Sequence, residues 1–224
     1  MGALFDSYFK SLEMTGIMSL APVKRKAFFS FHYDDIMRVN NVRQAFKLYN
    51  PGTVLGGPTF YDSSLWESRK LEGDEALKRL IREGVEYTSV VCVLVGTNTW
   101  WRRWVKYEIA RSIVDERGLL AVHINGINHH QRRVPDARGV NPLTRMAVGK
   151  MSDGTYRIFE RTSFGWERYS DYSSAVKLPK YLHEPAVGHV TPLNWNTMEY
   201  DFAAQNGSKN IGGWLDLAAK MAGR

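Results

Sequence analysis

Cysteine is nearly absent from this chain of 224 residues, and Cys92 is the only one that it contains. A single cysteine excludes an intrachain disulfide, and with it the small secreted modules that depend on such bridges. Cys92 lies inside the apolar run from Val90 to Val95. We therefore expect a buried, inert thiol at this position rather than a nucleophile.

Long apolar segments are also absent. No window reaches the roughly 18 consecutive apolar residues of a membrane span. The opening sequence MGALFDSYFK lacks the basic and then apolar layout of a signal peptide, and Asp6 stands where a myristoylation motif needs Ser or Thr. These absences predict a cytoplasmic protein without a membrane partner.

The common sequence motifs of nucleotide, metal and hydrolase sites are missing too. The chain contains no G-x-x-x-x-G-K-[ST], no G-x-G-x-x-G after a strand, no H-E-x-x-H and no G-x-S-x-G. His129 and His130 are adjacent, a poor geometry for binding one metal ion, so we expect no metal site. The formal charge of +7 is a property that nucleic-acid-binding proteins share. The cations are scattered, however, which favours an ordinary basic surface over a nucleic-acid partner.

Strand and helix patterns alternate at short intervals through the first 124 residues. Hydrophobic residues make up 44% of the chain, which is enough for a substantial core. The pattern predicts strands at 26–31, 89–95 and 119–124, a weaker strand at 53–55, and helices at 36–48, 73–85, 101–116 and 212–222. Unbroken apolar strands between helices are typical of a parallel sheet that is covered on both faces.

The pattern is looser outside this core. We expect an N-terminal extension at 1–24 and one domain at 25–224, with its core at 26–128, a decoration at about 130–192 and a C-terminal segment at 193–224. Tyr156 to Phe159 and Trp166 to Tyr169 suggest a β-hairpin in the decoration.

A carboxylate interrupts an apolar stripe in the helix predicted at 101–116. At about 100° per residue, one arc of this helix carries Trp101, Trp104, Val105, Ile109 and Ile113, and Glu108 lies inside it. Glutamate is rarely placed in such a stripe without a partner, because removing its charge from water is costly. Spacing alone leaves two explanations open: a structural carboxylate that pairs with an arginine or reaches solvent, and a functional one.

A second polar cluster, His32 to Asp35, directly follows the first predicted strand. In parallel α/β sheets, ligands bind beyond the carboxyl ends of the strands, and the beginning of the helix at 101–116 lies at that same edge. Asp35 is best interpreted as a cap of the following helix. His32 and Tyr33 have no such simple structural role, so we expect them to line a binding site.

Several segments, taken in order, resemble a known family. These are AFFSFHYDD, SLWE with GDEALKRLI, TSVVCVLVG and RRWVKYEI. They are similar to the TIR-like proteins of bacterial anti-phage defence, in particular those of the Thoeris system, over roughly residues 26–128 and 198–216. The resemblance implies a flavodoxin-like α/β fold, a parallel sheet with helices on both faces. A β-rich or irregular decoration and a C-terminal helix complete the expected architecture.

The resemblance also implies an activity of the NAD+ nucleosidase or ADP-ribosyl cyclase type, which cleaves the nicotinamide–ribose bond of NAD+. The W-x-x-x-E motif of the family matches Trp104 to Glu108, so the resemblance makes Glu108 the catalytic carboxylate. His32, Tyr33, Asp34 and Trp104 are candidates for substrate binding, by contacting the ribose or stacking on a ring. NAD+ is then a substrate, and no cofactor is expected.

In Thoeris defence, the resemblance implies that the product is a cyclic ADP-ribose isomer, a signal detected by a partner effector protein. It further implies head-to-tail association of the domain with itself. The alternative is a TIR-like interaction module or nucleotide-binding sensor without turnover. An open cleft at Glu108 favours the enzyme, whereas a buried salt bridge favours the module.

Overall fold

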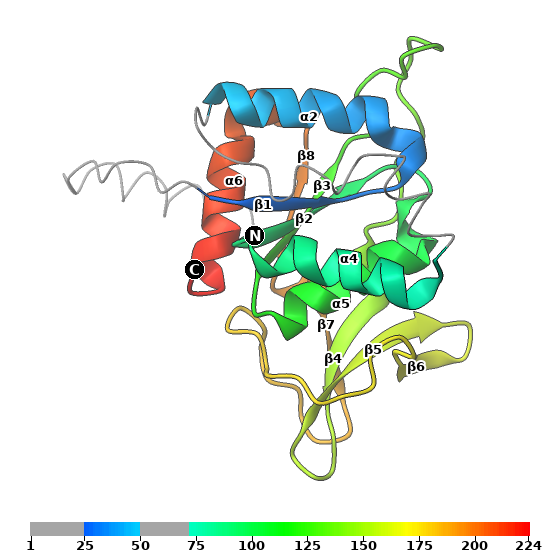
Figure 1. Cartoon of the computed structure of the whole chain (residues 1–224), viewed down its shortest axis with the longest axis vertical. Coiled ribbons are helices and arrows are strands. Elements are labelled where there is room, and N and C mark those ends of the chain that lie inside the picture. The colour runs from blue at the N-terminus through cyan, green and yellow to red at the C-terminus, as the bar shows by residue number, and fades with distance from the viewer. Residues whose placement is uncertain (1–24, 50–71) are drawn as a thin grey trace, which may run out of the picture.

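A parallel four-stranded sheet forms the centre of the structure, a computed structural model that describes residues 25–49 and 72–224 (Figure 1). Its strands are β1 (Ala27–Ser30), β2 (Val90–Val95), β3 (Gly118–His123) and β8 (Met198–Asp201), and they lie in that spatial order. The three main predicted strands are thereby confirmed. The strand predicted at 53–55 and the extension at 1–24 lie outside the described residues.

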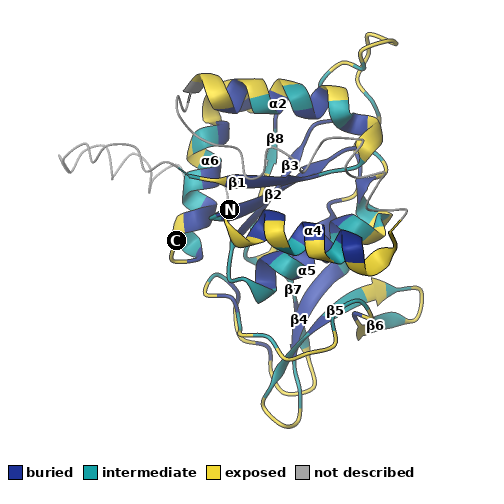
Figure 2. Ribbon diagram, in the orientation of Figure 1, coloured by how far each residue is buried: buried dark blue, intermediate teal, exposed yellow. Residues whose placement is uncertain are grey.

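Helices cover both faces of this sheet. One face is covered by α2 (Ile36–Tyr49) and α6 (Gly207–Met221), and the other by α4 (Asp74–Glu86) and α5 (Arg103–Val114) (Figure 1). Side chains alternate along each strand, so Phe28 packs towards α4 and α5 whereas Phe29 packs towards α2 and α6. All six residues of β2 are buried, Cys92 among them (Figure 2). The doubly covered parallel sheet confirms the predicted flavodoxin-like α/β fold.

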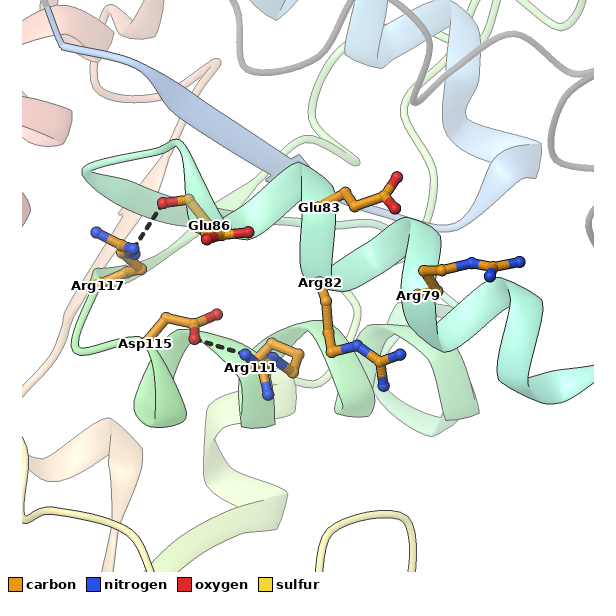
Figure 3. Close-up of a pocket in the computed structure, with 7 residues that line it drawn as sticks. All are labelled: Arg79, Arg82, Glu83, Glu86, Arg111, Asp115 and Arg117. Atoms are coloured by element: carbon orange, nitrogen blue, oxygen red, sulfur yellow. Dashed lines mark hydrogen bonds and ion pairs between the residues drawn. The ribbon is translucent and has the colours of Figure 1, made fainter.

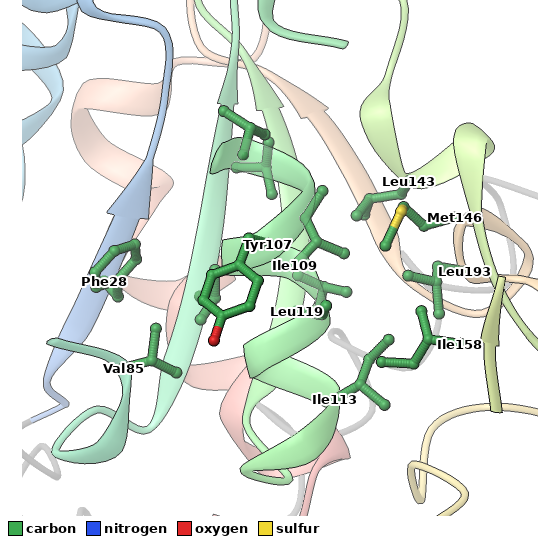
Figure 4. Close-up of a cluster of buried hydrophobic side chains, with 14 of the residues drawn as sticks. Phe28, Val85, Tyr107, Ile109, Ile113, Leu119, Leu143, Met146, Ile158 and Leu193 are labelled. Carbon is green, nitrogen blue, oxygen red and sulfur yellow. The ribbon is translucent and has the colours of Figure 1, made fainter. Parts of the chain in front are cut away.

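The decoration is a second sheet, which is antiparallel. Its strands are β4 (Met146–Lys150), β5 (Tyr156–Thr162), β6 (Gly165–Arg168) and β7 (Val190–Pro192), and their spatial order is β6-β5-β4-β7. The predicted hairpin is the β5–β6 pair, while β4 and β7 were not predicted. Met146 and Ile158 belong to the same buried cluster as Ile113 of α5 (Figure 4). The second sheet therefore packs against α5 on the side that faces away from the parallel sheet.

The helix predicted at 101–116 differs from the structure at both ends. A short 3-10 helix, η2 (Thr99–Trp101), comes first, and α5 starts only after Arg102, which is extended at φ −72° and ψ 121°. The hydroxyl of Thr99 accepts the N–H of Gly96 at 2.9 Å. At the other end α5 stops at Val114, and Glu116 adopts the left-handed conformation at φ 54°.

Gly118 is the first residue of β3. A Cβ atom at Gly118 would lie 2.4 Å from the carbonyl oxygen of Ala218, so glycine is required here for the close approach of α6. The C-terminal helix itself starts at Gly207, five residues earlier than predicted, because Ile211 is buried against the sheet. In the described ranges, no helix is long and apolar enough to cross a membrane.

Candidate active site

Three strands of the parallel sheet have their carboxyl ends at the same edge, and a polar segment follows each of them. β1 ends at Ser30, β2 at Val95 and β3 at His123. The chain continues from these ends into residues 31–35, 96–98 and 124–139. Because ligands bind beyond the carboxyl ends of parallel strands, this edge is the candidate site.

Glu108 is buried at this edge, with 5% of its surface exposed. It lies in the second turn of α5, and its Oε2 accepts a hydrogen bond of 2.5 Å from the hydroxyl of Ser30, the last residue of β1. Ser30 points towards α5 because it follows Phe28 by two residues on the strand. Neither structural explanation from the sequence applies. Within the described part of the chain, Glu108 has no arginine partner and does not reach solvent.

Burial raises the pKa of Glu108 to about 8, and the hydrogen bond from Ser30 acts in the opposite direction. The cause is the loss of hydration, which disfavours the charged form of a carboxyl group inside a protein. At neutral pH this group is therefore mostly protonated, although an ordinary glutamate is ionised there. Perturbed carboxyl groups of this kind are characteristic of functional sites.

His32 connects the end of β1 to the surface of the site. Its Nδ1 accepts the N–H of Asp34 at 3.0 Å and so caps the 3-10 helix η1 (Tyr33–Asp35). Burial lowers the pKa of His32 and the charge of Arg102 adds to this effect, whereas Asp34 and Asp35 raise the pKa. The neutral ring carries its proton on Nε2, because Nδ1 is the acceptor. Nε2 is buried, has no hydrogen-bond partner in the described part of the chain and lies 3.6 Å from a carboxylate oxygen of Asp34.

The other predicted binding residues differ in their exposure. Tyr33 is 61% exposed, and the side chain of Asp34 is 75% exposed. Trp104, in the first turn of α5, is half-buried and stacks edge-on against Tyr107 at 6.2 Å between ring centroids. Trp101 was expected on the same buried arc, but it lies in η2 and is 48% exposed. The two sequence segments that suggested a site are brought together, since Arg102 acts electrostatically on His32.

A buried ion-pair network fixes the loops of this edge relative to one another. Arg38 of α2 is 4% exposed and donates from Nη1 to Asp35 at 3.0 Å and from Nε to the carbonyl of Ile127 at 2.8 Å. Its Nη2 lies 2.9 Å from Asp136. Asp35 was interpreted as a helix cap, but its carboxylate accepts from Arg38 instead. The loops after β1 and β3 are therefore joined through one guanidinium group.

Two glycines permit the loop after β2 to join this arrangement. A Cβ atom at Gly96 would lie 1.9 Å from a carboxylate oxygen of Asp35. One at Gly139 would lie 1.9 Å from the carbonyl oxygen of Gly96. Both positions exclude any larger side chain, because a real Cβ does not approach other atoms this closely. All three strand-end loops are thus in contact.

Sequence reasoning missed Ser30 and Arg38. Ser30 was visible as a polar residue at the end of an apolar strand, but its partner Glu108 is 78 residues away. Asp35 and Arg38 have the i, i+3 spacing of a helical ion pair, a signal that was available. Their third partner, Asp136, lies in a loop with no recognisable pattern.

A pocket of about 520 Å³ lies between α4 and α5 (Figure 3). Its lining comprises Arg79, Arg82, Glu83, Glu86, Arg111, Asp115 and Arg117. Arg111 and Asp115 pair at 2.5 Å, and Arg117 donates to the carbonyl of Glu86 at 2.6 Å. The pocket contains none of the predicted site residues, and its cations and carboxylates are nearly balanced.

The described residues contain no cluster of three or more His, Cys, Asp or Glu that is suited to a metal ion. His129 and His130 stack at 4.6 Å between ring centroids, and His129 Nδ1 accepts the N–H of Gln131. These two histidines are therefore engaged with their own loop.

The parallel sheet between helices, with a buried glutamate on the helix after β2, defines a TIR-like α/β protein. The profile of the family described as "Thoeris protein ThsB, TIR-like domain" matches residues 28–129. A relative from Bacillus cereus (strain MSX-D12), named "Putative cyclic ADP-D-ribose synthase ThsB1", is 34% identical over 195 residues. The match covers 86% of this chain and 99% of the relative. The chain therefore belongs to the Thoeris ThsB family, as the ordered motifs suggested.

Proposed function

We propose that this protein cleaves NAD+ at the nicotinamide–ribose bond, with Glu108 as the catalytic carboxylate, and releases a cyclic ADP-ribose isomer as a signal in Thoeris anti-phage defence. The observation that carries the proposal is the buried Glu108, hydrogen-bonded to Ser30 at the ligand-binding edge of the sheet. Membership of the ThsB family supports the choice of NAD+ as substrate, and so does the printed name of the Bacillus cereus relative.

The reaction needs no strong general acid. Nicotinamide in NAD+ is cationic and leaves as a neutral molecule, taking both electrons of the bond to ribose. The ribose becomes an oxocarbenium ion, and an ionised Glu108 next to it would stabilise that positive charge. Attack by water gives ADP-ribose, whereas attack by a hydroxyl group of the same molecule gives a cyclic isomer. Either attack releases one proton, which the Glu108 carboxylate is able to accept.

The protonation state of Glu108 is consistent with a role in stabilising the oxocarbenium ion. Before NAD+ binds, burial keeps the carboxyl group mostly neutral at pH 7. The positive charge of nicotinamide favours the carboxylate, since a nearby opposite charge lowers the pKa of an acid. The charge that the transition state needs is then produced when substrate arrives, in a site with little water.

The remaining predicted residues have surroundings that suit substrate binding. His32 offers an Nε2 donor to a ribose hydroxyl, and Asp34 offers an exposed carboxylate. Tyr33 is exposed and Trp104 is half-buried, and both rings are candidates for stacking on nicotinamide or adenine. An enclosed site would favour the cyclic product, because water competes with the internal nucleophile.

A second candidate, a TIR-like interaction module or nucleotide sensor without turnover, is favoured by one observation. Only 5% of Glu108 is exposed, and its carboxyl group is already hydrogen-bonded to Ser30. A carboxyl group in that state is suited to a structural role unless substrate or assembly opens the site.

Head-to-tail association and a partner effector also belong to the proposal. Association that completes the site would explain a resting state in which Glu108 is covered. The effector would be linked to this protein through the nucleotide product and not by direct contact. The resemblance to the TIR-like proteins of Thoeris defence is what supports the proposal of these two partners.

The test is release of nicotinamide from NAD+ by the purified protein, followed by liquid chromatography. Glu108→Gln is expected to lower turnover by roughly 100-fold or more, as loss of a charge-stabilising group does. Glu83→Gln is the matched control, because Glu83 is an exposed glutamate of α4 outside the site. Unchanged turnover in Glu108→Gln would remove Glu108 from the mechanism. Binding of NAD+ without turnover, even after addition of an extract from infected cells, would favour the sensor.

A further inference from the structure

The β5–β6 hairpin separates its charges between two faces of the second sheet. Ile158 is buried and Glu160 pairs with Lys106 of α5 at 2.8 Å, so both point towards the helix. Residues alternate along a strand, and Arg157, Phe159 and Arg161 therefore point the other way, away from α5. The carboxylate of β5 lies on the inner face and its two arginines lie on the outer face.

The register of the hairpin extends this pattern to β6. Arg161 is directly opposite Trp166, and Phe159 is directly opposite Arg168. Opposite residues of an antiparallel pair share a face, so each pair places one arginine beside one aromatic ring. The guanidinium carbon of Arg161 lies 5.7 Å from the centre of the Trp166 ring. Glu167 is opposite Glu160 and so lies on the inner face.

The tip of the hairpin adds a third aromatic ring. Phe164 is 90% exposed in the turn between Thr162 and Gly165. The turn is fixed, since the N–H of Phe164 donates to the hydroxyl of Thr162 at 3.1 Å and Gly165 supplies a φ of 118°. Phe164 therefore adds a large exposed apolar side chain at the tip of the hairpin.

Together Arg157, Phe159, Arg161, Phe164, Trp166 and Arg168 form what we call the arginine–aromatic face. Figure 1 places the hairpin at the outer end of the second sheet, with β6 as its edge strand. Arg161 and Arg168 are exposed and have no carboxylate partner within the described residues. Asp153, in the turn before β5, interacts electrostatically with Arg157, so Arg161 and Arg168 supply most of the available positive charge.

We propose that the arginine–aromatic face binds single-stranded nucleic acid, with phosphates on the arginines and unstacked bases on the rings. Alternating cations and rings match a ligand that alternates phosphates and planar bases. A duplex would use the arginines alone, because its bases are already stacked on one another. An acidic protein segment would likewise leave the three rings without a role. These arginines are separated from one another in the sequence. The register of the hairpin places them on the same face of the second sheet.

The experiment measures fluorescence anisotropy of labelled dT20, rU20 and a 20-base-pair duplex with the full-length protein. Single strands are expected to bind with a Kd on the order of 10–100 µM at 50 mM NaCl, and more tightly than the duplex. Two phosphate contacts, on Arg161 and Arg168, predict affinity roughly 7-fold weaker at 200 mM NaCl. Arg161→Gln should reduce the slope of log Kd against log salt concentration by the amount that corresponds to about one phosphate contact. Trp166→Leu should weaken binding about 5-fold or more with the salt dependence unchanged.

Arg79→Gln is the control, because Arg79 is an exposed arginine on α4 away from this face. Circular dichroism and thermal melting of each variant separate loss of binding from loss of fold. Three results would each overturn the proposal: no binding at 50 mM salt, equal affinity for duplex and single strand, or equal weakening by Arg79→Gln and Arg161→Gln. Displacement of dT20 by poly-glutamate at an equal concentration of charge would overturn it in favour of an acidic protein partner.

Discussion

At the scale of single residues, the hydrogen bond between Ser30 and Glu108 is the centre of the account. It joins the end of β1 to α5 and is the one side-chain hydrogen bond seen for this buried carboxyl group within the described residues. Ser30 favours the ionised form of Glu108, whereas burial favours the neutral form. The balance of these two effects determines the pH at which the carboxylate is available.

The first prediction concerns the pH dependence of activity. If the carboxylate is the active form, kcat/KM should rise with pH and level off above about 8, the pKa of Glu108 in the free protein. Ser30→Ala should move this midpoint to higher pH, because a hydrogen bond that favours the carboxylate is lost. Ser30→Thr keeps the hydroxyl and should restore the original midpoint. A profile that stays flat between pH 6 and 9 would show that ionisation of Glu108 does not control the rate.

The second prediction concerns stability. Glu108 has a pKa of about 8 in the folded protein and 4.5 as its ordinary value, so the folded state holds a proton that the unfolded chain releases between these pH values. Its contribution to stability is therefore largest below pH 4.5 and is lost as pH rises towards 8. Because the side chain of Gln does not titrate, Glu108→Gln removes this pH dependence of stability.

Thermal melting should reveal the effect as a Tm difference between Glu108→Gln and the unmodified protein. The difference should be small at pH 4.5 and grow in favour of the variant up to pH 8.5, at roughly 2–4 °C per kcal/mol for a chain of this size. Glu83→Gln should show a difference that does not vary with pH. A constant difference for Glu108→Gln would mean that its pKa is not raised by burial.

The position of Glu108 was predictable because an isolated carboxylate in an apolar helical arc has few structural explanations. Ser30 was not predictable, because nothing local indicates which helix crosses the end of a strand. Trp101 was misplaced for a different reason. The extended backbone of Arg102 interrupts the helix, so the angular spacing of 100° per residue does not extend back to Trp101.

At the scale of elements, the site depends on loops that are held together rather than on any one helix. Arg38 joins the loop after β1 to the loop after β3, and Gly96 lets the loop after β2 pack between them. This network keeps His32 and Tyr33 in place above the end of β1. Short strand-end loops would otherwise be the least stable part of the fold.

The third prediction is that Arg38→Met destabilises the protein far more than Arg132→Met, although both arginines pair with Asp136. Arg38 is buried, and its loss leaves the buried Asp35 without its cationic partner and Asp136 with only the exposed Arg132, which costs about 3 kcal/mol or more. The side chain of Arg132 is 59% exposed, so its removal should cost less than about 1 kcal/mol. Urea denaturation measures both values. Similar losses for the two variants would show that the network contributes no more than a surface ion pair.

Elements with strong local patterns were predicted correctly, and those with distant partners were not. Each strand of the β1–β2–β3 set is buried throughout and mostly apolar, and α4 has its apolar residues on one face. In contrast, β4, β7 and β8 are strands of three to five residues, and they form only when β5, β4 and β3 supply their hydrogen bonds. Their pairing depends on residues that are distant in the sequence. A short stretch of sequence therefore contains little information about it.

At the scale of the whole molecule, a net charge of +7 is distributed unevenly. Arginines gather on the outer face of the second sheet, while the pocket between α4 and α5 is nearly neutral. Composition gives the total charge but not its distribution, since residues far apart in the sequence meet on one face. The parallel sheet and the second sheet also share one buried cluster, so the decoration and the core fold together.

The fourth prediction follows from the proposed head-to-tail association. If assembly completes the site, the specific activity towards NAD+ should increase with protein concentration, because a larger fraction of the protein is then associated. Activity measured alongside light scattering over a hundred-fold range of concentration tests this. Specific activity that is constant while the mass remains that of a monomer would show that one chain is sufficient.

The most direct test of the central claim is mass spectrometry of nucleotides from phage-challenged cells that express the unmodified protein or Glu108→Gln. The account predicts that NAD+ falls and that free nicotinamide and a cyclic ADP-ribose isomer appear with the unmodified protein only. The same product in cells that express a folded Glu108→Gln variant would contradict it.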